Sequence, residues 1–295
     1  MKNNINYFYD LITYDIHQEN NDFIFTVESQ KYILYEYTRE EIEIPELYVL
    51  NTLLNSYGLP FHKIVLNKNN QIITEMDDKK YVLVKLMIEK YTVSNQEILM
   101  NSIIINQNFE AIKRTNWYEL WSKKIDNIER LVEESGDKYH LIRESINYYI
   151  GLAENALMIT RRIGKNKICI EHRILNDLSS YTVYNPLNLV LDNKTRDLSN
   201  LIKYFAIYKE EVFDNISLIF SLENNEKICL LARMMFPDYY FNMVEEIINK
   251  NKKENDLKII LDKKEKIEEI IIYIYSIVKV NYNDLDIEWI KKVGY

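Results

Sequence analysis

The scarcity of glycine is the feature that most limits what this chain can fold into. Only five of its 295 residues are glycine, and the first of them is Gly58. Glycine permits backbone conformations and close approaches that other residues do not. The dinucleotide-binding motif of Rossmann domains and the phosphate loop of Walker-type ATPases both need glycines at fixed spacing. The sequence therefore argues against both folds and against any other glycine-rich cradle for phosphate.

Charge and hydropathy exclude further classes of protein. The chain carries 37 basic and 45 acidic residues, for a net charge of −8. Such a surface repels the phosphate backbone of nucleic acids, so we expect no nucleic-acid partner. The longest strongly apolar run, Ile270 to Val278, spans nine residues. This is about half the length that a membrane-spanning helix needs, so we expect no membrane span. Two cysteines, Cys169 and Cys229, are too few for a disulfide framework and suit a reducing compartment.

The first 90 residues predict strands with one helix among them. The helix is expected between Pro45, a residue common at the first helical position, and Gly58, which is followed by Pro60. Short segments rich in aromatic and β-branched residues, separated by polar turns, predict five strands at residues 23–27, 32–37, 63–66, 72–75 and 81–86. The expected order is strand, strand, helix, strand, strand, strand.

The remainder of the chain predicts helices. Apolar residues recur at helical spacing from Trp117 to Leu131 and again from His140 to Arg161. Helices return at Asp197 and continue to the end, and short apolar segments at residues 168–170 and 183–191 lie on either side of a loop. We therefore predict an α+β fold of two lobes. Residues 1–90 form a small antiparallel β lobe, residues 91–295 form a mainly helical lobe, and the boundary falls near residues 88–97.

A loop histidine twenty residues before an aspartate, between such lobes, suggests a protein-kinase-like fold. Kinases need a strand lysine, a helix glutamate, a catalytic loop of the pattern H-R-D-x-x-x-x-N and a later aspartate that binds Mg²⁺. Here His172 and Arg173 match the loop, but Ile174 replaces its aspartate and Ser179 replaces its asparagine. Isoleucine cannot accept a proton, so the loop is degenerate. Asp192 follows an apolar strand and is the candidate metal ligand.

The nucleotide side of the pattern is also altered. The loop at residues 17–22 has no glycine, and its Glu19 and Asp22 would repel phosphates. Tyr35 occupies the expected lysine position, and the candidate helix glutamate, Glu46, would therefore have no lysine partner. We expect no cofactor and no binding of ATP with Mg²⁺. We also expect one cleft lined by residues 33–36, 83–90, 172–179 and Asp192.

Two further segments carry a family resemblance. These are YYIGLAENA at Tyr148–Ala156 and ARMMFPDYYF at Ala232–Phe241, joined by a weaker DIEWI at Asp286–Ile290. Over about residues 10–293 the chain resembles the spore-coat kinase-like family of Bacillota, the CotS and YutH type, on the aminoglycoside phosphotransferase and choline kinase fold. The resemblance implies a protein of the cytoplasm or the spore coat whose partners are other proteins, such as coat components.

Three functions stay open at this point. The first is a catalytically inactive kinase-fold protein, a pseudokinase, that acts as a scaffold or interaction module, with His172 and Arg173 in structural roles. The second is a divergent ATP-dependent phosphotransferase for small molecules, with Mg²⁺ at Asp192 and with Asn176 or Asp177 in a shifted register. The third is a sensor that binds a nucleotide or metabolite without turning it over.

Overall fold

The computed structural model describes residues 1–19, 21–100, 103–104, 108–135, 138–175, 177–209 and 218–293. These residues fall into two compact units. The first unit is formed by Met1–Ile98, Asn106–Lys113 and His172–Leu191, and the second by Leu99–Ile105, Arg114–Glu171 and Asp192–Tyr295. The first unit thus takes in the loop that begins at His172. The predicted lobe division at residue 90 stays a prediction.

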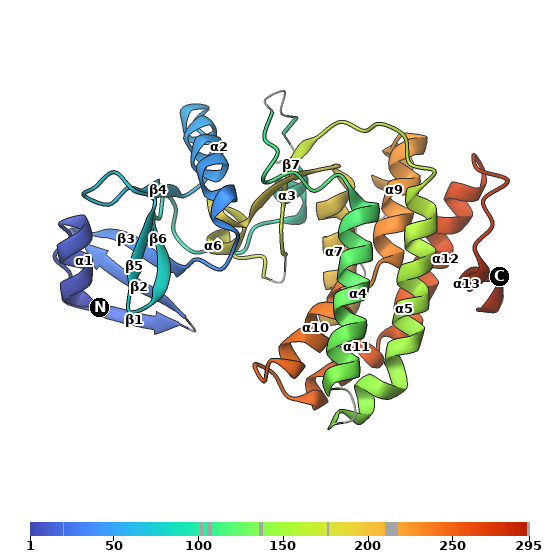
Figure 1. Cartoon of the computed structure of the whole chain (residues 1–295). Coiled ribbons are helices and arrows are strands. Elements are labelled where there is room, and N and C mark those ends of the chain that lie inside the picture. The colour runs from blue at the N-terminus through green and yellow to red at the C-terminus, as the bar shows by residue number, and fades with distance from the viewer. Residues whose placement is uncertain are drawn as a thin grey trace. The chain divides into compact units, whose positions relative to one another are not determined.

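The first unit is built on a six-stranded antiparallel sheet (Figure 1). Its strands are β1 (Ile16–Glu19), β2 (Asp22–Val27), β3 (Gln30–Glu36), β4 (Lys63–Val65), β5 (Ile73–Met76) and β6 (Lys79–Lys85). The order is β1-β2-β3-β6-β4, and β5 pairs with the same strand β6. Helix α2 (Ile44–Ser56) separates β3 from β4. The five predicted strands and the helix among them are confirmed.

Gly58 ends helix α2 as the sequence predicts. Its backbone φ is +74°, the left-handed region that glycine enters without steric cost. Leu59 N donates to Leu54 O at 3.2 Å, and Gly58 N donates to Asn55 O at 3.0 Å. These two bonds form a Schellman motif, which satisfies carbonyl groups that the helix end would leave free.

Two hairpins in the sheet turn without glycine. The β2–β3 turn places Glu28 and Ser29 at φ values of 47° and 69°, and the β5–β6 turn places Asp77 and Asp78 at 52° and 61°. Two-residue hairpins of this kind require positive φ at both turn residues, and Asn-Gly is the favoured pair. Here non-glycine residues adopt positive φ at both turns, and each carries the steric cost of the left-handed conformation.

Helix α1 (Lys2–Tyr9) covers one face of the sheet, and the sequence did not predict it. Ile5 and Tyr9 lie one turn apart and pack in one buried cluster with Phe25, Leu34 and Leu83. The Tyr9 hydroxyl also forms a 2.7 Å hydrogen bond with the Thr74 hydroxyl. Because side chains alternate along strands, Ile33, Val82 and Val84 face the other side, and they too are buried.

Several short elements also escaped prediction. They are β1, α3 (Asn95–Met100) and α6 (Ser180–Val183). Strands β7 (Cys169–His172) and β8 (Leu189–Asp192) flank the predicted loop. The apolar stretch expected at residues 183–191 is a strand only from Leu189, because α6 and a 3₁₀ turn at Pro186–Asn188 occupy its first part.

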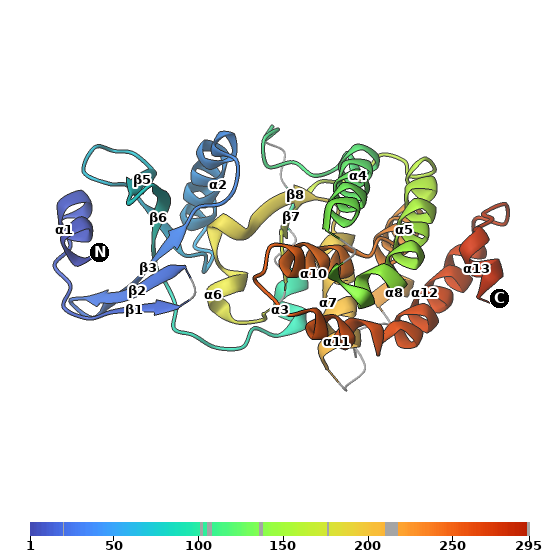
Figure 2. The ribbon, with the colours of Figure 1, turned by 60° about the horizontal axis from the view of Figure 1, so that its bottom comes forward.

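The second unit is helical (Figures 1 and 2). Its helices are α4 (Trp117–Ser135), α5 (His140–Thr160), α7 (Thr195–Tyr208), α8 (Leu218–Ser221), α9 (Asn224–Met235), α10 (Asp238–Ile248), α11 (Lys258–Leu261), α12 (Lys264–Lys279) and α13 (Glu288–Lys292). Helix α9 packs against α5, α7 and α12. Every residue from Ile228 to Met235 is buried, as expected for a helix that is surrounded on all sides.

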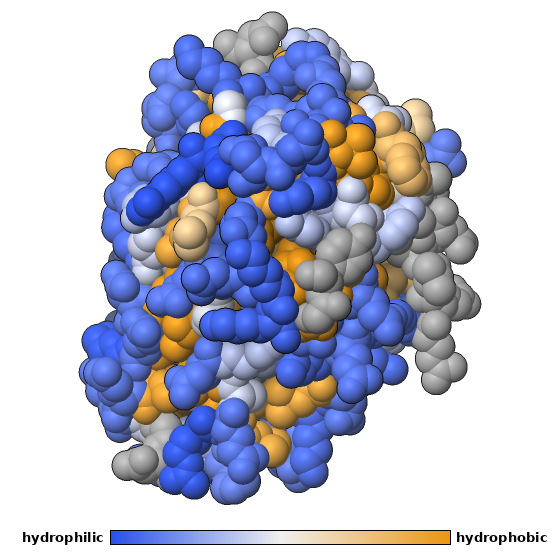
Figure 3. Space-filling view, turned by 90° about the vertical axis from the view of Figure 1, so that its right-hand side faces the viewer, coloured by the Kyte–Doolittle hydropathy of each residue, from blue (hydrophilic) through white to orange (hydrophobic). Residues whose placement is uncertain are grey.

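Helix α12 contains the longest apolar run of the sequence, and it lies at the edge of this unit. Ile271, Ile274 and Val278 are buried, while Glu269 before them and Tyr273 between them are exposed. The face that carries α12 and α13 is mostly hydrophilic, with smaller hydrophobic areas between the polar side chains (Figure 3). No helix in the described part of the chain is long and apolar enough to cross a membrane.

Candidate functional site

The loop that begins at His172 is held by hydrogen bonds within the first unit. His172 Nε2 lies 2.8 Å from the carbonyl oxygen of Val183 in α6, and the histidine is buried. Arg173 N donates to Asn188 O at 2.7 Å. The Asn188 side chain contacts Ile174 twice, because its oxygen accepts from Ile174 N at 3.1 Å and its nitrogen donates to Ile174 O at 2.9 Å. The loop therefore keeps a defined path without the catalytic groups.

The degenerate positions carry no group that could serve as a base. Ile174 is exposed, and Ser179 is buried with its hydroxyl bonded to Asp177 Oδ2 at 2.6 Å. Asp177 also accepts from Ser179 N at 3.0 Å and from the Thr182 hydroxyl at 3.2 Å. These bonds fasten the start of α6. Asn176, the other residue of the shifted register, lies outside the described residues.

A cavity of about 410 Å³ lies within the first unit, beside this loop. Ile33 and Tyr35 line it from β3, and Lys90, Arg173 and Ile174 also line it. Further lining residues are Glu19, Asp22, Ile24, Asp177, Ser179, Tyr181, Thr182, Asn185, Leu187 and Asn188. The structure thus brings together residues from three of the four segments expected in one cleft. Asp192, the fourth, is not among the lining residues and belongs to the second unit.

The strand side of the cavity is acidic and aromatic. Glu19 and Asp22 are paired across the β1–β2 turn, and both line the cavity. Asp22 Oδ1 accepts from Glu36 N at 2.9 Å, and burial raises the pKa of this carboxyl. Burial also raises the pKa of Tyr35, so its phenol stays neutral. Arg173 and Lys90 are the cationic side chains among the lining residues.

Glu46, the candidate helix glutamate, is bonded to backbone amides. Its two carboxylate oxygens accept from Glu110 N at 3.0 Å and from Ile112 N at 3.1 Å. The buried cation nearest to it in sequence is Arg39, which pairs with Glu43 at the start of α2. Sequence reasoning missed this pair, although its i,i+4 spacing is a recognisable signal.

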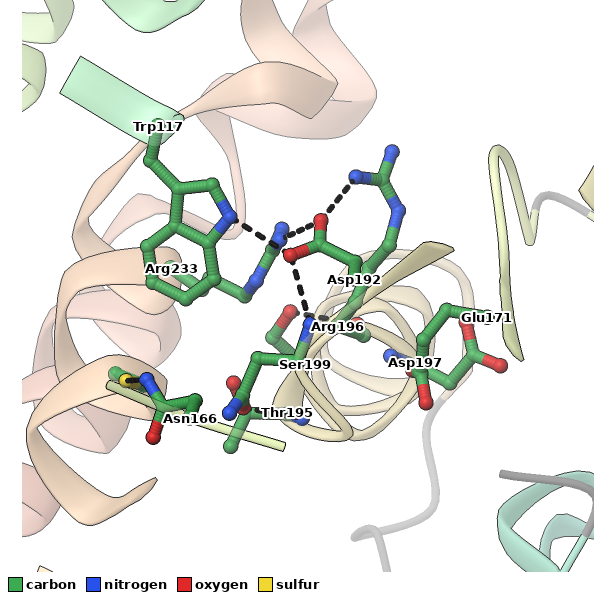
Figure 4. A network of polar contacts seen from close by, with 11 residues as sticks. Trp117, Asn166, Glu171, Asp192, Thr195, Arg196, Asp197, Ser199 and Arg233 are labelled. Atoms are coloured by element: carbon green, nitrogen blue, oxygen red, sulfur yellow. Dashed lines mark hydrogen bonds and ion pairs between the residues drawn. The ribbon is translucent and has the colours of Figure 1, made fainter. Parts of the chain in front are cut away.

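Asp192, the candidate metal ligand, lies fully buried in a network of polar contacts within the second unit (Figure 4). Its Oδ1 accepts from the Trp117 indole N–H and from Asn193 N, both at 2.8 Å. Its Oδ2 pairs with Arg196 at 2.8 Å and with Arg233. Both carboxylate oxygens of Asp192 therefore already accept hydrogen bonds.

The helix that follows Asp192 is tied back by a different acid. Glu171 Oε2 accepts from Asp197 N at 2.8 Å, and both residues are fully or almost fully buried. A carboxylate suits this position, because it offsets the positive end of the helix dipole.

Comparison with known proteins shows the family to which this chain belongs. The family model described as "Spore coat putative kinase YutH" matches residues 2–273. The chain belongs to this family. The Endospore coat-associated protein YutH of Bacillus subtilis (strain 168) is 24% identical over 270 residues, which cover 79% of this chain and 76% of that protein. The family resemblance found in the sequence is thereby confirmed.

Solved structures confirm the fold of this YutH-family chain. An aminoglycoside phosphotransferase from Alicyclobacillus acidocaldarius matches with a TM-score of 0.58 and 11% identity, covering 92% of this chain and 94% of that one. The choline kinase LicA from Streptococcus pneumoniae matches with a TM-score of 0.55 and 13% identity, covering 92% and 97%. The predicted α+β fold of the aminoglycoside phosphotransferase and choline kinase type is confirmed.

A buried histidine supports the segment that carries Lys90 into the cavity. His62 is fully buried, and its Nδ1 accepts from Met87 N at 3.2 Å. Its backbone N donates to Tyr184 O at 2.9 Å, which links β4 to the end of α6. Burial lowers the pKa of His62 from 6.5 to about 4.

This shift predicts a pH dependence of stability. Because the folded pKa lies below the unfolded one, the unfolded state binds the proton first, and stability falls as the pH drops from about 6.5 toward 4. Between pH 7 and pH 5 the parent should lose about 2 kcal/mol more unfolding free energy than His62→Asn, which retains an acceptor near Nδ1. Denaturant titrations at both pH values measure this. The exposed His140→Asn variant should follow the parent, and a His62→Asn variant that also follows it would contradict the assignment.

Proposed function

We propose that this YutH-family chain keeps the kinase fold without phosphoryl transfer and acts as an interaction module of the endospore coat. The observation that carries the proposal is that other side chains and a backbone amide already bind both carboxylate oxygens of Asp192. A metal-binding aspartate has to offer free lone pairs to a hard cation. Here both carboxylate oxygens already accept hydrogen bonds, two of them from guanidinium groups that would repel Mg²⁺.

The other positions of the kinase pattern support the same conclusion. Tyr35 offers no charge to a phosphate, and Ile174 cannot order a hydroxyl. The hydroxyl of Ser179 donates a hydrogen bond to Asp177. Glu19 and Asp22 add negative charge at the hairpin that covers phosphates in the pattern. The changes at Tyr35, Glu19 and Asp22 weaken the electrostatic hold on a triphosphate, and the change at Ile174 removes the group that would order the attacking hydroxyl.

One observation favours a second candidate, a divergent phosphotransferase that uses ATP and Mg²⁺. Asp177 lines the cavity together with Arg173 and Lys90, so an acid and two cations face one space in the first unit. In this case Asp177 would take over the role of the missing loop aspartate. The bonds from Ser179 and Thr182 to its carboxylate weigh against this, because they occupy the atoms that would accept the proton.

Calorimetry with ATP separates these two functions. We expect no heat of binding for ATP with Mg²⁺ up to about millimolar concentration, because Tyr35 supplies no charge at the lysine position and both oxygens of Asp192 already accept hydrogen bonds. The choline kinase LicA, titrated under the same conditions, serves as the positive control. A micromolar dissociation constant for ATP with Mg²⁺ would favour the phosphotransferase.

The stability of an Asp192 variant tests the structural role of this carboxylate. Asp192→Asn should lower the free energy of unfolding by about 3–5 kcal/mol, since it removes the carboxylate that pairs with the buried Arg233 and with the partly exposed Arg196. The exposed Asp126→Asn on α4 is the matched control and should change it by less than about 0.5 kcal/mol. Chemical denaturation measures both. If the Asp192→Asn protein is as stable as the parent, this carboxylate does not have the structural role proposed for it.

We infer the coat location of this chain from its relative in Bacillus subtilis, whose name describes that protein as endospore coat-associated. Partners of this chain are then other coat proteins. A fluorescent fusion expressed in sporulating Bacillus subtilis that lacks its own YutH should collect at the spore periphery. The fusion carrying Asp177→Asn should collect there equally, because an interaction module needs no catalytic group. A diffuse mother-cell signal for the parent fusion would contradict the coat role.

A further inference from the structure

Helix α2 is attached to the segment at residues 108–113, here called the strap. Glu46 accepts from two strap amides, with Oε1 on Glu110 N at 3.0 Å and Oε2 on Ile112 N at 3.1 Å. A carboxylate that binds two amides fixes both the position and the direction of the segment that donates them. Phe109 and Ile112 of the strap are buried, so the segment is also packed.

The strap is attached in turn to strand β8. Leu191 N donates to Ile112 O at 3.0 Å, and Lys113 pairs with Leu191 in a parallel bridge. The strap therefore connects α2 to β8, and all of these residues belong to the first unit.

Arg39, which precedes α2, makes a second connection, from Glu43 at the N-cap of α2 to the start of β8 and the turn before it. It pairs with Glu43, and its Nη1 donates to Leu187 O at 2.7 Å and to Leu189 O at 2.9 Å. The Arg39 side chain is only 4% exposed. A guanidinium that is desolvated in this way is costly to leave without its acceptors, so the contact resists separation of α2 from β8.

We propose that Glu46, the strap and Arg39 form a clamp that holds α2 on β8 in one position, whether or not a nucleotide is bound. In kinases the helix glutamate pairs with the strand lysine, and this pair must form for phosphoryl transfer. Here Tyr35 stands at the lysine position, and Glu46 holds backbone instead. The clamp goes beyond the proposed function. It rests on that function in one respect, the expectation that ATP does not change the clamp.

Hydrogen exchange measured by mass spectrometry tests the clamp on the full chain. In Glu46→Ala the amides of peptides covering residues 108–113 should exchange at least about tenfold faster than in the parent. Glu46→Gln keeps one acceptor oxygen and should give an intermediate rate. Glu41→Gln, which removes a charge beside the same helix while leaving the strap bonds intact, is the matched control and should leave the rate unchanged. Strap rates within about twofold of the parent in both Glu46 variants would overturn the clamp.

Three further outcomes are distinguishable. If Glu46→Ala does not fold, as judged by a missing thermal transition, Glu46→Gln carries the test alone. Addition of ATP with Mg²⁺ to the parent should leave strap exchange unchanged, and slower exchange would overturn the independence from nucleotide. ATP binding seen by calorimetry without any change at the strap would overturn the proposed function and leave the clamp intact.

Discussion

The carboxylate of Asp192 is the point on which the helical unit depends. It lies at the end of β8 and receives an indole N–H from α4, one guanidinium from α7 and another from α9. Three helices that are far apart in the sequence thus share one buried anion. Buried charges are tolerated only when paired and hydrogen-bonded, so each helix has to hold its donor in place. Replacing the whole network by apolar residues need not destabilise the unit, but removing one member leaves the others uncompensated.

The excess positive charge of this network is also accommodated. Arg233 stacks over the Trp117 ring at 4.1 Å from its centroid, and a cation over an indole face is stabilised electrostatically. Nearby, Lys203 donates to Asp238 Oδ1 at 2.7 Å and to Phe236 O at 2.9 Å. Burial lowers the pKa of both Arg233 and Lys203, and the carboxylate partner of each opposes this shift. Trp117 therefore contributes to the unit both as a core side chain and as a polar partner.

Two carboxylates at kinase-like positions hold structure in this chain. Asp192 binds arginines, and Glu46 binds strap amides. A carboxylate that is surrounded by protein needs hydrogen-bond donors, because an unpaired buried anion is unstable. The fold supplies these donors from its own side chains and backbone.

The sequence by itself determined the elements whose signals are local. The aromatic and β-branched strand segments, the glycine stop of α2 and the isoleucine at position 174 can all be read within a few residues. The Asp192–Arg196 pair is local too, since the residues are one helical turn apart. Only the tertiary structure decided the partners of Arg233, which lies 41 residues from Asp192, and of Glu46, which lies 66 residues from Ile112. Helix α1 was decided in the same way, because its asparagine-rich sequence has weak helix propensity and forms a helix by packing Ile5 and Tyr9 on the sheet. Donors for a buried charge are chosen by proximity in the folded chain, and sequence spacing carries no record of that proximity.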